Sequence, residues 1–100
     1  MIKVTVLYGH PADPDAFERY YATTHVPIAL TMKGFVKHEF TKFGPGPDGS
    51  KPAYFRMAEF WFENEAALQQ TLTSPEAQKT MGDIPNFADG GATFMFGAVI

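Results

Sequence analysis

The segment YFRMAEFWFE, residues 54 to 63, constrains the fold more than any other part of the chain. Alternate residues of a β-strand point to opposite faces of a sheet. On this pattern Phe60 and Phe62 lie on one face, and Phe55, Met57 and Trp61 lie on the other. Because both sets are large and apolar, both faces of the strand must be covered by other parts of the molecule.

Three further segments have strand character. Residues 2 to 8 alternate apolar and polar side chains with only Leu7 as an exception, which is typical of a half-buried strand. Residues 35 to 43 predict a second strand, and residues 92 to 100 predict the last one. The glycine- and proline-rich segment that follows residue 43 predicts an exposed loop.

A helix is expected after the first strand, with Asp13 as its N-cap and Pro14 at its first position. Pro27 disfavours helical geometry at Val26, so we expect the helix to bend or restart beside His25. Gly34 is predicted to close the segment. At about 100° per residue, the apolar stripe comprises Phe17, Tyr21, Thr24 and Ile28, with Tyr20 and His25 on its two flanks.

The second helical region has two cap signals. Asn64 can cap a helix over EAALQQTL, and Ser74 before Pro75 can cap another over EAQKTM, which predicts two short helices or one broken helix. The resulting order is β-α-β-β-α-β. This is the ferredoxin-like split βαβ order, an α+β fold in which a four-stranded antiparallel sheet carries both helices on one face.

The sheet face away from the helices is too apolar in part to stay wet. It is predicted to carry Thr5, Leu7, Met57, Trp61, Met95 and Val99. A second copy of the same sheet is the natural cover, and two identical sheets packed back to back give an isologous homodimer with a barrel-like centre. We therefore expect a homodimer.

Composition excludes several classes of function. The chain has 100 residues, no cysteine and a formal net charge of −3, and its cations are scattered. These features predict one domain over residues 1–100, no disulfide or thiolate chemistry and no nucleic-acid partner. No apolar run resembles a signal peptide or membrane span, so we expect a cytoplasmic protein without a membrane partner. No metal-ligand spacing, glycine-rich phosphate loop or nucleophile elbow is present, so no metal is predicted.

Three segments together resemble the EthD family, named for ethyl tert-butyl ether degradation. They are LYGHPADPDAFERYYATTHVPIA, AEFWFENEAALQQTLTSPEAQ and DIPNFADGGATFMF. The most specific part is the pattern Tyr-Tyr-x-x-x-His-x-Pro, formed here by Tyr20, Tyr21, His25 and Pro27. The sequence departs from relatives at Met32-Lys33 before Gly34, where an Ile-Pro-Gly turn is common.

The resemblance implies a dimeric α+β barrel and a link to oxidative breakdown of ethers, with an oxygenase system as a candidate partner. Related barrels include cofactor-free monooxygenases, isomerases and haem-degrading enzymes, so the fold alone does not choose a reaction. A single histidine, whether His25 or His38, is weak evidence for haem. No cofactor is therefore predicted.

His25 is the principal candidate for catalysis because imidazole exchanges protons near neutral pH. The alternative is a packed histidine bonded to a backbone carbonyl. Tyr21 is the second catalytic candidate, with a core aromatic as its alternative. The candidate substrate-binding residues are Tyr20, His38, Phe40 and Phe60. His10 is expected to be a solvated loop residue.

Three functions are compatible with these residues. The first is a small homodimeric enzyme or auxiliary protein of oxidative catabolism, acting on a small apolar molecule between helices and sheet with His25 transferring a proton. The second is a carrier that sequesters a reactive intermediate unchanged. The third is a structural subunit of an oxygenase, which predicts no cavity near His25.

Overall fold

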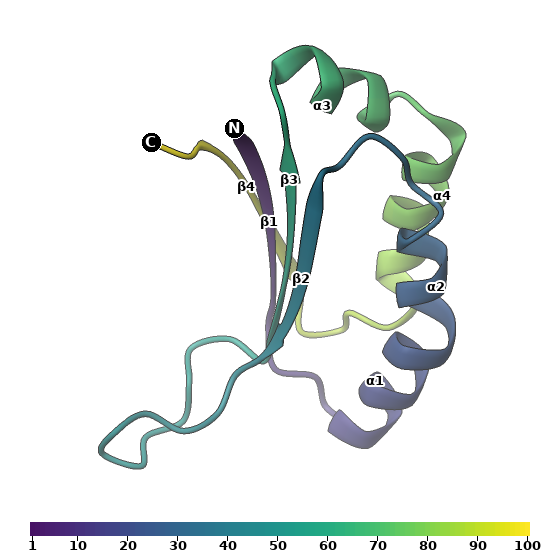
Figure 1. Cartoon of the computed structure of the whole chain (residues 1–100). Coiled ribbons are helices and arrows are strands. Elements are labelled where there is room, and N and C mark those ends of the chain that lie inside the picture. The colour runs from purple at the N-terminus through teal and green to yellow at the C-terminus, as the bar shows by residue number, and fades with distance from the viewer.

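The computed structural model describes residues 1–100 and contains one four-stranded antiparallel sheet with its helices on one face (Figure 1). The strands are β1 (Ile2–Tyr8), β2 (Lys37–Lys42), β3 (Arg56–Phe62) and β4 (Ala92–Ala98), in the order β2-β3-β1-β4. The helical segments are α1 (Pro14–Tyr20), the π-helix η1 (Tyr21–His25), α2 (Val26–Ala29), α3 (Glu65–Leu72), α4 (Pro75–Asp83) and the 3-10 helix η2 (Ile84–Asn86). The predicted ferredoxin-like α+β fold is confirmed.

The core lies between the two central strands and the helices. Val4 and Val6 of β1 are buried, and they pair in register with Phe60 and Ala58 of β3. Fully burying an aliphatic or aromatic side chain of this size contributes roughly 1.5–3 kcal/mol relative to leaving it exposed. The alternation of apolar residues in these strands is therefore sufficient to fix which face of the sheet receives the helices.

Three strands are shorter than the sequence indicates. The strand predicted over residues 35 to 43 covers only β2, the one predicted over residues 54 to 63 covers only β3, and the one predicted over residues 92 to 100 ends at Ala98. The expectation that Phe55 shares a face with Met57 and Trp61 is wrong. Phe55 precedes β3 and packs edge-on against Phe17 of α1, with ring centroids 5.1 Å apart. Strand alternation does not apply to a residue outside the regular ladder.

The first helical segment continues through Val26, contrary to the expectation that Pro27 would move this residue out of helical geometry. Val26 has φ −59° and ψ −45°, and its N–H donates to the carbonyl of Tyr21. This wide π turn lies immediately before Pro27. A proline ring clashes with the carbonyl four residues earlier in a regular α-helix, and a wider turn relieves that clash. The break in the helix that we expected beside His25 is therefore a change in backbone hydrogen bonding, from the α pattern to the π pattern.

The π turn also changes which residues face the core. A regular helix would bury Thr24 and Ile28 after Tyr21, whereas His25 and Ala29 are buried and Thr24 and Ile28 are only partly covered. The extra residue in the turn shifts the helical phase by one position. His25 thereby moves from the flank of the apolar stripe into it.

The predicted N-caps of the helices are confirmed. Side-chain oxygens of Asp13, Asn64 and Ser74 accept hydrogen bonds from backbone N–H groups three residues later, at 3.1, 2.9 and 3.2 Å respectively. Each cap satisfies one N–H group that the helix leaves unpaired. The region after β3 thus forms two short helices.

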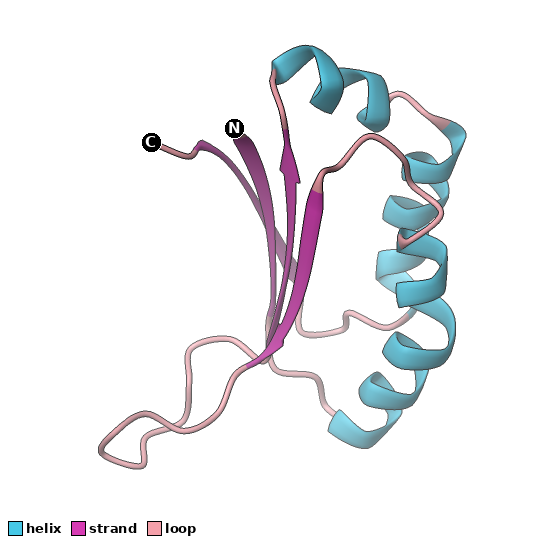
Figure 2. Ribbon diagram, in the orientation of Figure 1, coloured by secondary structure: helices cyan, strands magenta, loops and turns pink.

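The opposite face of the sheet carries no helix, and the loop between β2 and β3 projects away from the body (Figure 2). Register places Thr5 beside Met95 and Leu7 beside Met57 on this free face. These residues therefore share a face as the sequence predicted. None of the helices has the length and apolar character needed to cross a lipid bilayer.

The turn after α2 depends on Gly34, which has φ +97°. A Cβ atom at this position would lie 2.5 Å from Thr71 Oγ1, which donates to the Lys33 carbonyl. Gly34 therefore provides both the backbone conformation and the space for a contact between this turn and α3.

Gly34→Ala should lower the free energy of unfolding by roughly 1–3 kcal/mol, since it adds backbone strain and a steric clash. Gly44→Ala is the matched control, because a Cβ there meets nothing within 4 Å. Urea denaturation of both variants measures the difference. Equal stabilities would contradict a structural role of the Gly34 turn.

Candidate functional site

A cavity of about 60 Å³ lies between the helices and the sheet. Sixteen of its nineteen lining residues are hydrophobic. The lining residues that stay exposed are Met81 of α4 (45%) and Phe94 and Phe96 of β4 (38% and 56%). These three side chains mark where the cavity opens to solvent.

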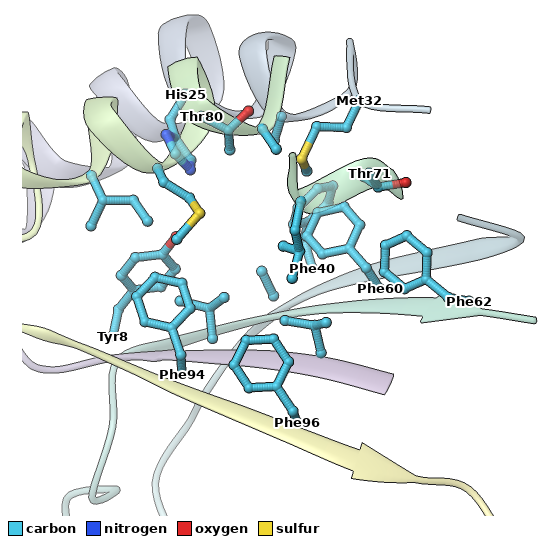
Figure 3. A pocket seen from close by; sticks show the side chains of 18 of the residues that line it. Tyr8, His25, Met32, Phe40, Phe60, Phe62, Thr71, Thr80, Phe94 and Phe96 are labelled. Carbon is cyan, nitrogen blue, oxygen red and sulfur yellow. The ribbon is translucent and has the colours of Figure 1, made fainter. Parts of the chain in front are cut away.

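His25 points from the helical layer into this cavity (Figure 3). The residue is only 3% exposed, and its Nδ1 lies 2.9 Å from Asp83 Oδ2. Its other ring nitrogen, Nε2, makes no hydrogen bond within the chain. The Asp83 bond joins the first helical segment to the end of α4 and fixes the orientation of the imidazole.

Asp83 is a buried carboxylate that accepts three side-chain hydrogen bonds. Besides His25, the Tyr20 hydroxyl donates to Oδ1 at 2.5 Å and Asn86 Nδ2 donates to the same oxygen at 3.1 Å. Burial acts to raise the pKa of Asp83, but the bonds from Tyr20, His25 and Asn86 together lower it below its ordinary value. The group is therefore ionised at neutral pH.

The protonation state of His25 follows from this environment. Burial lowers the pKa of His25 below 6.5, and the Asp83 hydrogen bond and charge only partly oppose that effect. The imidazole is therefore neutral at pH 7. With Nδ1–H donating to Asp83, the lone pair is on Nε2, which can accept a proton from a molecule in the cavity.

Two tyrosine side chains add further polar groups to the cavity, whose lining also includes Thr71 and Thr80 with hydroxyls that donate to the Lys33 and Glu76 carbonyls. Tyr21 is 3% exposed, its hydroxyl has no hydrogen-bond partner, and burial raises its pKa to about 12 despite the nearby Arg56 charge. Tyr8 is 1% exposed, and burial, followed by the proximity of Tyr21 and Asp83, raises its pKa. Both phenols are protonated at neutral pH and can donate hydrogen bonds.

Arg56 supports Tyr21 from the sheet. Its guanidinium lies 5.1 Å from the centre of the Tyr21 ring and forms a two-point ion pair with Glu18 of α1, with Nε at 2.7 Å and Nη2 at 2.5 Å from the carboxylate oxygens. Bidentate pairs of this kind fix geometry as well as charge. Tyr21 is thus held between the His25 imidazole and a cation that is already paired.

The EthD domain family model matches residues 9–91. The chain belongs to the EthD family. This EthD protein is 38% identical over 96 residues to an uncharacterized 11.0 kDa protein of the thcB-thcC intergenic region in Rhodococcus erythropolis, a match that covers 96% of this chain and 92% of the relative. The family assignment that the Tyr-Tyr-x-x-x-His-x-Pro pattern suggested is confirmed.

Solved structures agree with the fold. An EthD family protein from Bacillus halodurans C-125 superposes with a TM-score of 0.92 at 28% identity, covering 100% of this chain and 99% of that chain. SnoaB, a cofactor-independent oxygenase from Streptomyces nogalater, superposes with a TM-score of 0.65 at 14% identity, covering 99% of this chain and 91% of that chain. At that identity the second likeness shows the fold alone.

The structure brings four of the six predicted site residues to the cavity. They are His25, Tyr21, Phe40 and Phe60. Tyr20 does not line the cavity, and its hydroxyl bonds Asp83 instead. His38 also lies outside: it is exposed at the edge strand β2, with its ring centre 5.4 Å from that of Phe35. His10 Nε2 lies 2.7 Å from the Pro52 carbonyl in the loop region.

Sequence reasoning missed Asp83 and Tyr8. Asp83 follows Ala77 and Thr80 at intervals of three residues on α4, and all three are buried. A carboxylate in such a stripe requires partners, which was the available signal. Tyr8 continues the alternation of Val4 and Val6 on the buried face of β1, so its burial could be predicted but the exposure of its hydroxyl to a cavity could not.

Asp83→Asn tests the role of the carboxylate as a positioning group. Loss of the negative charge should lower the pKa of His25 further, because only burial then acts strongly on it. NMR titration of the His25 ring in both proteins measures this change, with the exposed Asp15→Asn as control. A His25 pKa that stays unchanged or rises in the Asp83 variant would contradict the assignment.

The lowered pKa of His25 also predicts how the stability of the protein depends on pH. The native pKa of His25 lies below 6.5, the ordinary value that applies in the unfolded chain. At pH values between the native pKa and 6.5 the unfolded chain therefore binds a proton more readily than the folded protein. Stability therefore rises with pH through that interval, and this rise should disappear in His25→Gln. Urea denaturation between pH 5 and 7 measures it.

Proposed function

We propose that this EthD protein binds a small, uncharged and mostly apolar molecule between its helices and sheet, and acts on it by proton transfer through His25. The observation that supports this most is a buried, neutral imidazole whose Nδ1 is held by Asp83 and whose Nε2 is free toward the cavity. A histidine that only packed would leave no nitrogen unpaired beside an open space.

The apolar lining strengthens such chemistry. Hydrogen bonds and charges act more strongly where water is excluded, and Asp83 can stabilise the imidazolium that forms when Nε2 takes a proton. The three-residue network around Asp83 prevents the imidazole from turning away. Tyr20 therefore acts in this proposal through Asp83, as a positioning residue.

Membership of the EthD family and the fold shared with a cofactor-independent oxygenase support a role as a small protein of catabolism. Within oxidative catabolism, an oxygenase system is the partner we propose. A carrier that releases its ligand unchanged uses the same cavity, and chemical analysis of ligand recovered after long incubation distinguishes the carrier from a catalyst.

Met81→Trp tests the cavity as a binding site, because the larger ring should block the opening without entering the core. Cyclopentane and cyclopentanone serve as probes, and binding is followed by chemical-shift changes of residues that line the cavity. Blocking should weaken binding by at least tenfold, whereas Gln78→Trp on the exposed side of α4 should leave it unchanged. Equal binding by both variants, or no binding by the parent protein, would refute the proposal.

We also propose that two copies associate through the free faces of their sheets. Met95 is 47% exposed there, and two lysine side chains lie over the ring of Trp61, with Lys37 Nζ 4.6 Å and Lys3 Nζ 5.6 Å from the ring centre. A sheet with apolar side chains on both faces is stabilised when a second sheet covers its exposed face.

Met95→Glu should convert the proposed homodimer into monomers, because the new carboxylates would be buried between the two sheets without partners. Sedimentation at micromolar concentration measures the mass, and Gln70→Glu on the exposed side of α3 is the control of equal charge. A parent protein that sediments as a single chain would exclude the dimer.

A further inference from the structure

We propose that the molecule bound in the cavity is an uncharged carbonyl compound with a hydrogen on the carbon next to the carbonyl group. His25 removes this hydrogen as a proton, while the hydroxyls of Tyr8 and Tyr21 hold the carbonyl oxygen. This assignment rests on the proposed function and adds to it the substrate class and the role of the two tyrosines.

The buried phenols are the first observation. Tyr21 and Tyr8 are 3% and 1% exposed, and the Tyr21 hydroxyl is buried without a hydrogen-bond partner, whereas Tyr8 lines the cavity and burial raises the pKa of its hydroxyl. An unpaired buried polar group is unfavourable, so native proteins seldom retain one unless it has a task. A hydrogen-bond acceptor on a ligand would satisfy both hydroxyls.

The chemistry of the lining indicates which acceptor this is. The cavity is lined by no lysine or arginine, and the guanidinium of Arg56 behind Tyr21 is already paired with Glu18. A carboxylate or phosphate ligand would therefore lose its hydration without gaining a counter-ion. Because the two phenols remain protonated, they favour a neutral oxygen on which negative charge develops during reaction.

The placement of the three rings is the second observation. The Tyr8 and Tyr21 ring centres are 5.6 Å apart, and the Tyr21 ring stacks on the His25 ring at 5.7 Å. Tyr8 extends from β1 and His25 from the helical layer, and both reach the same cavity (Figure 3). The rings of one candidate base and two candidate donors thus line one small space, and in the proposed step the two hydroxyls turn to the carbonyl oxygen when a ligand binds.

The proposed step is balanced without an oxidant or reductant. The C–H bond breaks and the proton moves to His25 Nε2. The electron pair of the broken C–H bond forms a C=C bond, and the carbonyl π electrons move to the oxygen. The product is an enolate that accepts hydrogen bonds from the two phenols, and Asp83 stabilises the imidazolium. If the proton on Nε2 is first replaced by one from solvent, its transfer to the same carbon gives exchange, and transfer of a proton to the far carbon of a conjugated system gives isomerisation.

The test is hydrogen–deuterium exchange at the carbons beside the carbonyl of cyclopentanone in D₂O, followed by proton NMR. The parent protein should accelerate exchange, His25→Gln should return it to the buffer rate, and Tyr8→Phe should slow it roughly a hundredfold, as removal of one oxyanion donor does in other enzymes. His10→Gln and Tyr54→Phe, both outside the cavity, are the matched controls and should exchange at the parent rate.

Tyr21→Phe separates function from folding. Because the change removes only an unpaired buried hydroxyl, thermal denaturation should occur at an equal or higher temperature, while exchange should slow by tenfold or more. A variant that is less stable and exchanges at the parent rate would show that the hydroxyl serves the core, which would overturn its assigned role.

The outcomes also separate this inference from the proposed function. Binding of cyclopentanone without accelerated exchange would overturn the inference and leave the binding cavity intact, whereas exchange that persists in His25→Gln would overturn the role of His25 in both proposals. Failure of both cyclopentane and cyclopentanone to bind would overturn both proposals.

Discussion

The position of His25 depends on the π turn that precedes Pro27. In a regular helix the next residue on the buried face after Tyr21 would be Thr24, and the His25 imidazole would lie at the edge of that face. The wider turn relieves the clash of the proline ring and advances the phase by one residue, so that His25 and Ala29 become buried. A backbone constraint imposed by one proline thus determines which side chain enters the cavity.

Burial of His25 in turn requires Asp83. A buried imidazole with both nitrogens unpaired would be costly, and the carboxylate satisfies Nδ1. Asp83 would itself be unfavourable in an apolar layer without its bonds from Tyr20 and Asn86. The pattern YYxxxH in the first helical segment and DIPN, which begins with the last residue of α4, are therefore two halves of one hydrogen-bonded network, although they are far apart in the sequence.

The sequence predicted the parts of the fold that depend on local patterns. The alternation of β1, the caps at Asp13, Asn64 and Ser74, and the order of the elements all follow from residues near one another in the chain. The partner of His25 could not be predicted in this way, because it lies 58 residues away and reaches the imidazole only through packing of α4 on the first helical segment.

The remaining differences between the predicted and the observed structure each concern a single residue. Regular periodicity placed His25 on a flank because it does not anticipate a π turn, and alternation placed Phe55 on the free face because it assumes a strand that has not yet begun. His38 illustrates another limit: it occupies a helix-facing strand position beside Phe60 in register, yet it is exposed at the sheet edge. Periodicity gives the direction of a side chain and not what covers it.

The cavity exists because small side chains occupy positions where helices and sheet face each other. Ala29, Ala58 and Ala77 line it and are 2%, 3% and 0% exposed, so these sites are enclosed without being filled. Protein interiors normally pack to the density of organic crystals, and a void forfeits contacts on its lining. Larger side chains at these positions would fill the space and improve packing, whereas the polar atoms of His25 and Tyr21 would then face hydrocarbon. In the function proposed above, a ligand in this space would supply both the contacts that the alanines leave unmade and an acceptor for the unpaired hydroxyl of Tyr21.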